Sequence, residues 1–177
     1  MVTEKHLNAL SVALFILVMG LARLLPHPEN IAPIGALALF SGAYIQHRYQ
    51  WLLPVAALLV GDLFLGGYNP VIMLGVYGGF AIGAIIARFT LHKRWTPARL
   101  ASIMVINALV FYLLSNLGMW WAAFPHSAAG LVQCYTLAQP YLAKSLLGDA
   151  LYTALVFGTA VVIQRLQHDR GTGTARL

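Results

Sequence analysis

Charged residues are scarce in this sequence. Aspartate, glutamate, lysine and arginine together make up 9% of its 177 residues, whereas soluble domains usually carry about 25%. Hydrophobic residues make up 60% of the chain, and its mean hydropathy is +0.76. Such a composition excludes an ordinary water-soluble domain, a disordered chain and a collagen-like fibre. The chain is instead long enough for about six membrane-spanning helices.

Cysteine is nearly absent, and Cys134 is the single one. One thiol cannot form an internal disulfide or a multi-cysteine metal site. The sequence also lacks HExxH and CxxC motifs, a P-loop, and the common Ser-x-x-Lys and Gly-x-Ser-x-Gly signatures of serine nucleophiles. We therefore predict that the protein is not an enzyme, holds no metal, carries no cofactor and does not itself hydrolyse ATP.

Six apolar stretches are candidates for membrane-spanning helices. They cover residues 8–25, 33–45, 51–66, 71–91, 98–124 and 140–166, with an outer loop at 125–139 and a flexible cytoplasmic tail at 167–177. A bilayer core of about 30 Å needs about 20 apolar residues, so the second and third stretches are short. Short spans leave irregular backbone at membrane depth, where it must line an enclosed or water-filled cavity. The sequence thus predicts an all-α bundle of six transmembrane helices in a single domain.

The basic residues predict how this bundle is oriented. Nine of the eleven lie at the N-terminus, in the second and fourth connections or in the tail: Lys5, Arg48, Arg88, Lys93, Arg94, Arg99, Arg165, Arg170 and Arg176. Because cytoplasmic segments are enriched in Lys and Arg, both termini are predicted to be cytoplasmic. The net charge of +6 is therefore attributed to topology and to contact with the lipid bilayer. No motif indicates nucleic-acid binding.

Polar residues that are costly in a membrane gather in the outer half of the predicted bundle. A charged residue near the centre of a span costs about 2.5–3.5 kcal/mol, so such residues are candidates for function. We predict one outward-facing substrate pocket, formed by His27, Asn30, Phe40, Asp62, Tyr68, Asn116, Tyr135, Lys144 and Asp149. The alternative is that Arg23 pairs with Asp62, or Lys144 with Asp149, and holds the helices together.

Small residues recur every fourth position in two of the stretches. Gly75, Gly79 and Gly83 form one stripe, and Ala9 and Ala13 form a shorter one. Such stripes allow helices to approach closely. They predict docking of a partner subunit or, alternatively, packing within the same chain.

Several stretches of the sequence are distinctive. They are RLLPHPENIAPIGALALFSGA (23–43), GDLFLGGY (61–68), SNLGMW (115–120), GLVQCY (130–135) and LGDALY (147–152). Together they resemble a family of small bacterial six-helix membrane proteins of unknown function that are described as transport proteins. That family is in turn similar to the S components of energy-coupling-factor vitamin transporters, and most of all to the solitary cobalamin-uptake type.

The resemblance implies a six-helix S-component fold in the bacterial inner membrane that binds a vitamin from outside and carries it inward. A coupling subunit and two ATPases would supply the energy, and the subunit would dock at the positions of Ala9 and Ala13. For cobalamin or a related corrinoid, the resemblance makes His27, Phe40 and Asp62 pocket residues.

Two other functions remain open at this point. A proton-coupled secondary transporter would use Asp62 and Asp149 as proton sites, because both carboxylates lie within apolar stretches. A membrane assembly factor would instead bind a partner through the glycine stripe.

Overall fold

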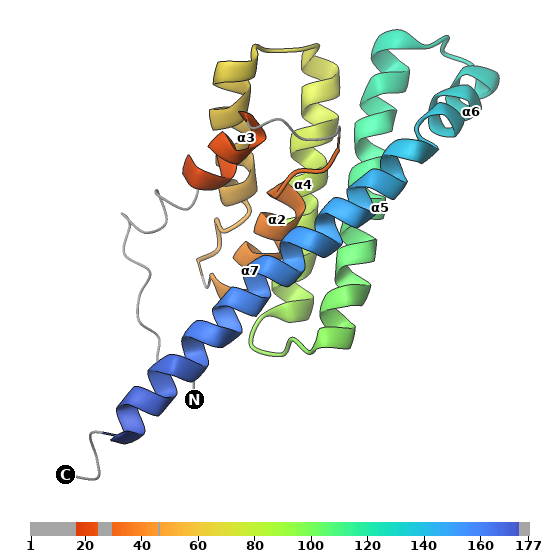
Figure 1. Cartoon of the computed structure of the whole chain (residues 1–177). Helices are drawn as coiled ribbons and strands as arrows, with labels where there is room; N and C mark the ends of the chain where they lie inside the picture. The colour runs from red at the N-terminus through yellow and green to blue at the C-terminus, as the bar shows by residue number, and fades with distance from the viewer. Residues whose placement is uncertain (1–16, 25–29, 46, 174–177) are drawn as a thin grey trace.

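The computed structural model describes residues 17–24, 30–45 and 47–173, and all regular structure in them is helical (Figure 1). Residues 17–21 form a helical turn that leads into a short 3-10 helix. The elements are η1 (Ala22–Leu24), α2 (Ile34–Tyr44), α3 (Leu52–Leu65), α4 (Pro70–Leu91), α5 (Pro97–Ala123), α6 (Ala128–Leu137) and α7 (Gln139–Gly173). The all-α prediction is thereby confirmed for the described residues.

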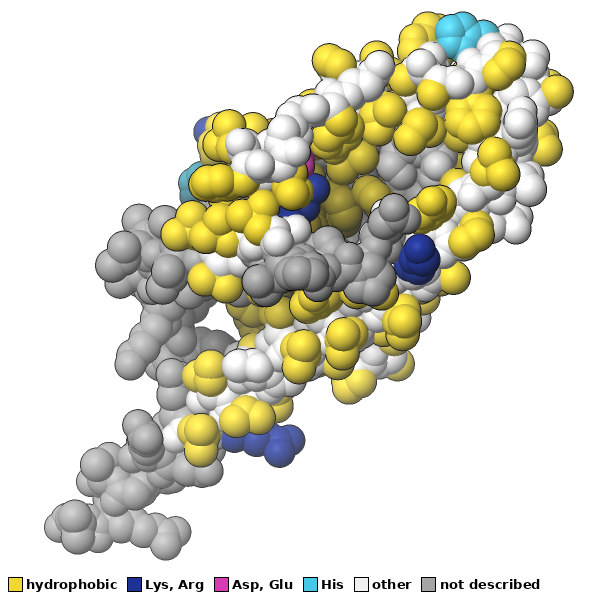
Figure 2. Space-filling view, turned by 45° about the horizontal axis from the view of Figure 1, so that its top comes forward, with side chains coloured by type: hydrophobic (Ala, Val, Ile, Leu, Met, Phe, Trp, Pro, Cys, Tyr) yellow, Lys and Arg dark blue, Asp and Glu magenta, His cyan; other side chains and the backbone are white. Residues whose placement is uncertain are grey.

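Three helices are long and apolar enough to cross a membrane. They are α4, α5 and the part of α7 from Gln139 to Leu166, whereas α2, α3 and α6 are shorter apolar helices. Large apolar side chains point outward from the long helices: Phe89 is 82% exposed and Leu74 is 75% exposed. Hydrophobic side chains also cover much of the face drawn in Figure 2. These features indicate association with a membrane, while most of the predicted first span, 8–25, lies outside the described residues.

Capping residues decide where three of the helices begin. The Asn69 side chain accepts a hydrogen bond of 2.9 Å from the Val71 amide, and the Thr96 hydroxyl accepts one of 3.2 Å from Arg99. A proline follows each cap at the first helical position, where its missing N–H is not needed. Ser127 caps α6 in the same way, so the predicted loop at 125–139 contains a helix. At the other end, α7 continues beyond residue 166 to Gly173.

The glycine stripe of α4 packs against α5 of the same chain. A Cβ atom at Gly79 would lie 3.1 Å from the Phe111 Cα, and Cβ atoms at Gly75 and Gly83 would collide with the Leu114 backbone and the Asn107 side chain. Glycine therefore allows the two antiparallel helices to pack closely along this face. Within the chain, α5 covers the face that these three glycines form, which is the alternative that the sequence left open beside docking of a partner.

Helix α2 lies at the centre of the bundle, and nearly all of its residues are buried. It packs against α3, α4 and α7, and α7 crosses obliquely over it (Figure 1). Its small residues make this possible: a Cβ atom at Gly42 would lie 2.6 Å from the Ala87 Cβ on α4. The Arg88 guanidinium then ties α4 to the α2–α3 connection through the carbonyls of Ile45 and His47, at 3.2 and 3.1 Å. At the end of the bundle away from this connection, α4, α5, α6 and the start of α7 surround a cavity.

Candidate functional site

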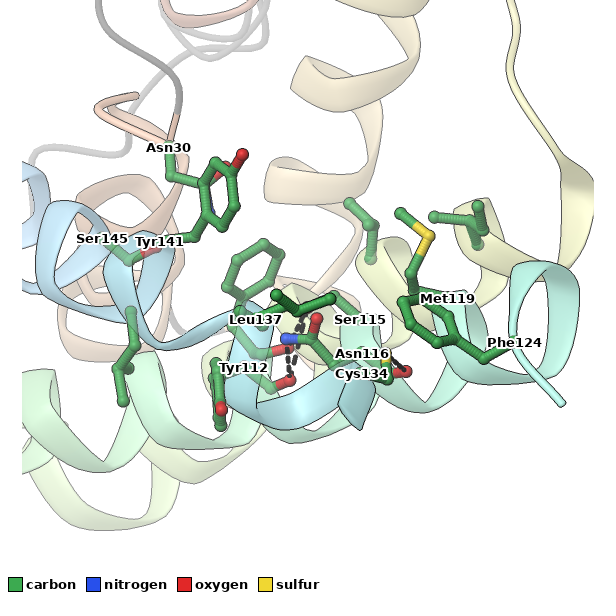
Figure 3. Close-up of a pocket in the computed structure, with 15 residues that line it drawn as sticks. Asn30, Tyr112, Ser115, Asn116, Met119, Phe124, Cys134, Leu137, Tyr141 and Ser145 are labelled. Atoms are coloured by element: carbon green, nitrogen blue, oxygen red, sulfur yellow. Dashed lines mark hydrogen bonds between the residues drawn. The ribbon is translucent and has the colours of Figure 1, made fainter. Parts of the chain in front are cut away.

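A cavity of about 400 Å³ lies between α4, α5, α6 and the first turns of α7 (Figure 3). Its lining residues are Asn30, Ile72, Val76, Phe111, Tyr112, Ser115, Asn116, Met119, Phe124, Cys134, Leu137, Ala138, Tyr141, Leu142 and Ser145. Small-molecule sites typically measure about 300–1,000 Å³ and have mostly apolar walls with a few polar groups. The cavity fits that description and is the candidate site.

One face of α5 supplies the floor of the cavity. Phe111, Ser115 and Met119 recur every fourth residue, as do Tyr112 and Asn116, so all five lie on one side of the helix. Helix α6 is held over this face by two hydrogen bonds between side chains and backbone. The Tyr112 hydroxyl donates to the carbonyl of Tyr135 at 2.5 Å, and the Tyr135 hydroxyl donates to the carbonyl of Leu113 at 2.6 Å.

Several polar groups of the lining are already bonded to the backbone. The Ser115 hydroxyl donates to the Phe111 carbonyl at 2.7 Å, and the Asn116 amide nitrogen donates to the Tyr112 carbonyl at 2.8 Å. The Cys134 thiol is directed at the Asn116 carbonyl at 3.5 Å, and burial raises the pKa of this thiol. These groups therefore shape the wall of the cavity. The side-chain oxygen of Asn116 takes no part in these hydrogen bonds and remains able to accept one.

A second set of polar groups lies at the other side of the cavity, where Figure 3 draws Asn30 beside Tyr141 and Ser145. Among the described residues, none of these three side chains has a hydrogen-bond partner. Asn30 is held there with a φ of 62°, in the left-handed region that asparagine tolerates. Gly148 allows α7 to approach this segment, because its Cβ position lies 3.0 Å from the Ile31 Cα. Ser145, just before it on α7, is 6% exposed.

Asp62 belongs to a separate cluster outside the cavity lining. Arg23 Nη1 lies 2.8 Å from Asp62 Oδ1 and donates to the Leu58 carbonyl at 3.0 Å, and the Tyr77 hydroxyl donates to Asp62 Oδ2 at 2.7 Å. The structure therefore contains the Arg23–Asp62 ion pair that the sequence left as an alternative. Tyr68 lies close enough to Asp62 and Arg23 for both charges to influence the pKa of its phenol. Burial, reinforced by Asp62 and opposed by Arg23, raises the pKa of Tyr68 to about 12, so the phenol stays neutral.

The nine predicted pocket residues do not converge on one site. Asn30 and Asn116 line the cavity, and Lys144 lies beside it with its Nζ 5.1 Å from the centroid of the Tyr141 ring. Tyr135 is turned to the α5 backbone instead. His27 lies outside the described residues, as do Ala9 and Ala13 of the predicted docking motif.

Two further predicted residues occupy other parts of the bundle. Phe40 stacks in an aromatic cluster, with ring centroids 4.7 Å from Tyr44 and 6.0 Å from Phe157, and it borders a second, apolar cavity of about 440 Å³. Asp149 is 6% exposed and lies against Gly35 of α2. The expected pocket residues are therefore divided among the cavity, the Arg23–Asp62 cluster, an aromatic cluster and a contact between α2 and α7.

The cavity also contains residues that the sequence did not single out, among them Tyr112, Ser115 and Ser145. One feature of the sequence could have indicated Ser145: it lies four residues before Asp149 and so shares a helix face with that predicted pocket residue. In the described part of the chain, no cluster of three or more His, Cys, Asp or Glu side chains is placed to hold a metal ion.

A family model described as "Family of unknown function (DUF6580)" matches residues 3–170. No curated protein and no solved structure matches the chain. The family match extends over nearly the whole sequence, including every segment that contributes to the cavity.

Proposed function

The chain belongs to the DUF6580 family of unknown function, and we propose that it is a membrane-embedded protein that binds a vitamin or similar small molecule for uptake. The observation that carries this proposal is the cavity of about 400 Å³ with apolar walls and a few unused polar groups. Its position among long apolar helices favours a ligand that is taken up through a membrane.

The proposal includes an orientation with the cavity facing outward. The α4–α5 connection carries Lys93, Arg94 and Trp95, whereas the α5–α6 connection beside the cavity carries no lysine or arginine. Because cytoplasmic loops are rich in basic residues, the α4–α5 end would lie in the cytoplasm of a bacterial cell and the cavity on the outer side. Trp120 and Trp121 would then lie at the outer interface.

The proposal further includes an architecture of six spans like that of S components, with both termini in the cytoplasm. The short helix α2 would be accommodated at membrane depth because nearly all of its residues are buried in the bundle. Helix α3 instead exposes apolar side chains such as Leu63 and Phe64, which would face lipid. A coupling subunit would dock near Ala9 and Ala13, and its ATPases would supply the energy. The resemblance makes cobalamin one ligand to test beside smaller vitamins.

Ligand binding by the purified protein tests this proposal. Calorimetry in mild detergent, with a panel of vitamins from nicotinamide to cobalamin, should identify at least one compound that binds. Asn116→Leu should weaken its binding, because the variant replaces an amide in the cavity wall with a branched apolar side chain and so changes the shape and polarity of that wall. Ser102→Ala is the matched control, since Ser102 lies on the same helix outside the lining. A panel without a single binder contradicts the proposal.

One observation favours a second candidate, a proton-coupled transporter. Asp149 is buried, and the described residues contain one salt bridge, which joins Arg23 to Asp62. A buried carboxyl without an ion pair is suited to binding and releasing a proton. This candidate requires that a pH gradient drive uptake into liposomes and that Asp149→Asn abolish it. Uptake that does not respond to the gradient would eliminate it.

A further inference from the structure

The lining of the cavity contains no charged side chain among the described residues. The fifteen lining residues that the structure describes are apolar or carry a neutral amide, hydroxyl or thiol. An ionised group buried against these walls loses its hydration, and the cation beside them, Lys144, lies over the Tyr141 ring outside the lining. Burying such a group is therefore unfavourable. The cavity therefore selects against a ligand whose buried part is ionised.

The walls near α5 favour an apolar or aromatic ligand body. Phe111 is held in place because its ring stacks on Phe80 with centroids 4.5 Å apart. Met119 and Phe124 lie together at the end of the cavity away from Asn30 (Figure 3). Aromatic faces and a flexible thioether pack well against flat or irregular apolar groups. This end would hold the apolar body.

The opposite end favours one neutral hydrogen-bonding group. The Asn30 amide offers both donors and an acceptor, and the hydroxyls of Tyr141 and Ser145 offer one of each. Ser145 is more than nine-tenths buried and without a partner in the described part of the chain, so its hydroxyl gains most from a ligand. An amide, urea, lactam or alcohol satisfies such a set better than a carboxylate, which cannot donate a hydrogen bond.

The size of the cavity sets a further limit. A volume of about 400 Å³ lies in the lower part of the range of about 300–1,000 Å³ for sites that enclose drug-sized molecules. A corrinoid, with its macrocycle, amide arms and nucleotide, is several times larger than a drug-sized molecule. The cavity is thus matched to a much smaller compound.

From charge, wall chemistry and volume together, we infer that the ligand is an uncharged molecule of drug size or less, with an apolar or aromatic body and one amide-like or alcohol end group. The inference rests on the proposed function and narrows it from vitamins in general to neutral, compact ones. The end group would bind Asn30, Tyr141 and Ser145.

Matched pairs of neutral and charged vitamins test the inference at pH 7. We would measure, by calorimetry, the binding of nicotinamide against nicotinate, panthenol against pantothenate, and biotinamide against biotin, with cobalamin as the large comparison. In at least one pair the neutral member should bind at least tenfold more tightly than its carboxylate. Equal or tighter binding of the carboxylate in every pair that binds, or tightest binding of cobalamin, would overturn the inference and leave the proposed function standing. A panel with no binder would overturn both.

Variants at the polar end test where the ligand's end group lies. Tyr141→Phe removes one hydroxyl, and Asn30→Gly removes the amide but suits the positive φ. Each should weaken binding of the preferred neutral compound at least fivefold and leave the thermal unfolding temperature unchanged. Tyr152→Phe, on the same helix but outside this lining, is the matched control. Unchanged binding in both cavity variants would contradict the assigned end.

Discussion

The carboxylate of Asp149 on α7 lies directly against Gly35 of α2, where even a methyl group would collide with it. Asp149 is therefore part of the contact between two helices as well as a candidate for proton binding. The contact explains why α2, an 11-residue helix, has glycine at its second position, where a better helix former would otherwise be favoured. Ser145 lies one helical turn before Asp149 on α7 and lines the cavity. The contact between Asp149 and Gly35 therefore lies close to the cavity wall.

Gly35→Ala should destabilise the protein by about 1–3 kcal/mol, because the added methyl overpacks this contact. The measurement is unfolding in detergent, followed by tryptophan fluorescence. Gly158→Ala on α7 is the control, since nothing lies within 4 Å of its Cβ position. That variant should be neutral or slightly stabilising.

A double variant tests whether the methyl group added by Gly35→Ala collides with the Asp149 carboxylate. If the carboxylate is responsible, Gly35→Ala combined with Asp149→Ala should be less destabilising than the sum of the two single changes. Strict additivity would show that α2 and α7 are not in this contact.

The Arg23–Asp62 pair should contribute to stability and not to ligand binding. Asp62 is buried and Arg23 is 17% exposed, so Arg23→Met alone leaves a buried, partly unpaired carboxylate and should cost about 3 kcal/mol. Combining it with Asp62→Leu should recover part of this loss, because no uncompensated charge then remains. The readouts are the unfolding temperature and the ligand dissociation constant in each variant. A large change in the ligand dissociation constant without loss of stability would contradict this prediction and show that Asp62 contributes to ligand binding.

The long helices could be predicted from the sequence because their signals are local. The predicted stretch 71–91 differs from α4 by one residue, and 98–124 differs from α5 by one residue at each end. Proline and a capping side chain mark the start of each. Helix α6 was missed since its ten residues are too few for a span, and its one strong signal was the cap at Ser127. Whether α2 and α3 span the membrane depends on packing that composition does not reveal.

The site was less predictable than the helices. Only polar residues that are costly in a membrane stand out in an apolar sequence, and several residues of the cavity are not of that kind. Asn116 stands out in an apolar stretch, whereas Ser115 and Ser145 cost little in a membrane and are not conspicuous there. Asp62 stands out most and yet is paired with Arg23. The order of residues alone does not distinguish a carboxylate that binds ligand from one that pairs with another helix, and the three-dimensional contacts separate the two cases.

Asn107→Leu should stabilise the protein. Asn107 is 1% exposed, lies against Gly83, and neither polar atom of its amide has a hydrogen-bond partner among the described residues. An unsatisfied buried amide costs about 1–3 kcal/mol, and leucine has a similar shape without that cost. Unfolding in detergent measures the gain, with Asn107→Asp as a comparison that should be less stable than the native protein. A loss of stability in the leucine variant would mean that the amide is hydrogen-bonded in solution.

Alkylation of Cys134 should report directly on the cavity. Cys134 is the single cysteine of the chain, lines the cavity and is 2% exposed. Because burial raises the pKa of the thiol, less of the reactive thiolate is present near neutral pH, and its rate of alkylation should continue to rise at a pH where an exposed thiol has levelled off. A compound that fills the cavity should slow the reaction further. The control is Ala128→Cys in a Cys134→Ser background, whose exposed thiol should react quickly and gain no protection. Rapid alkylation of Cys134, or a bound ligand that leaves its rate unchanged, would place the ligand elsewhere in the protein.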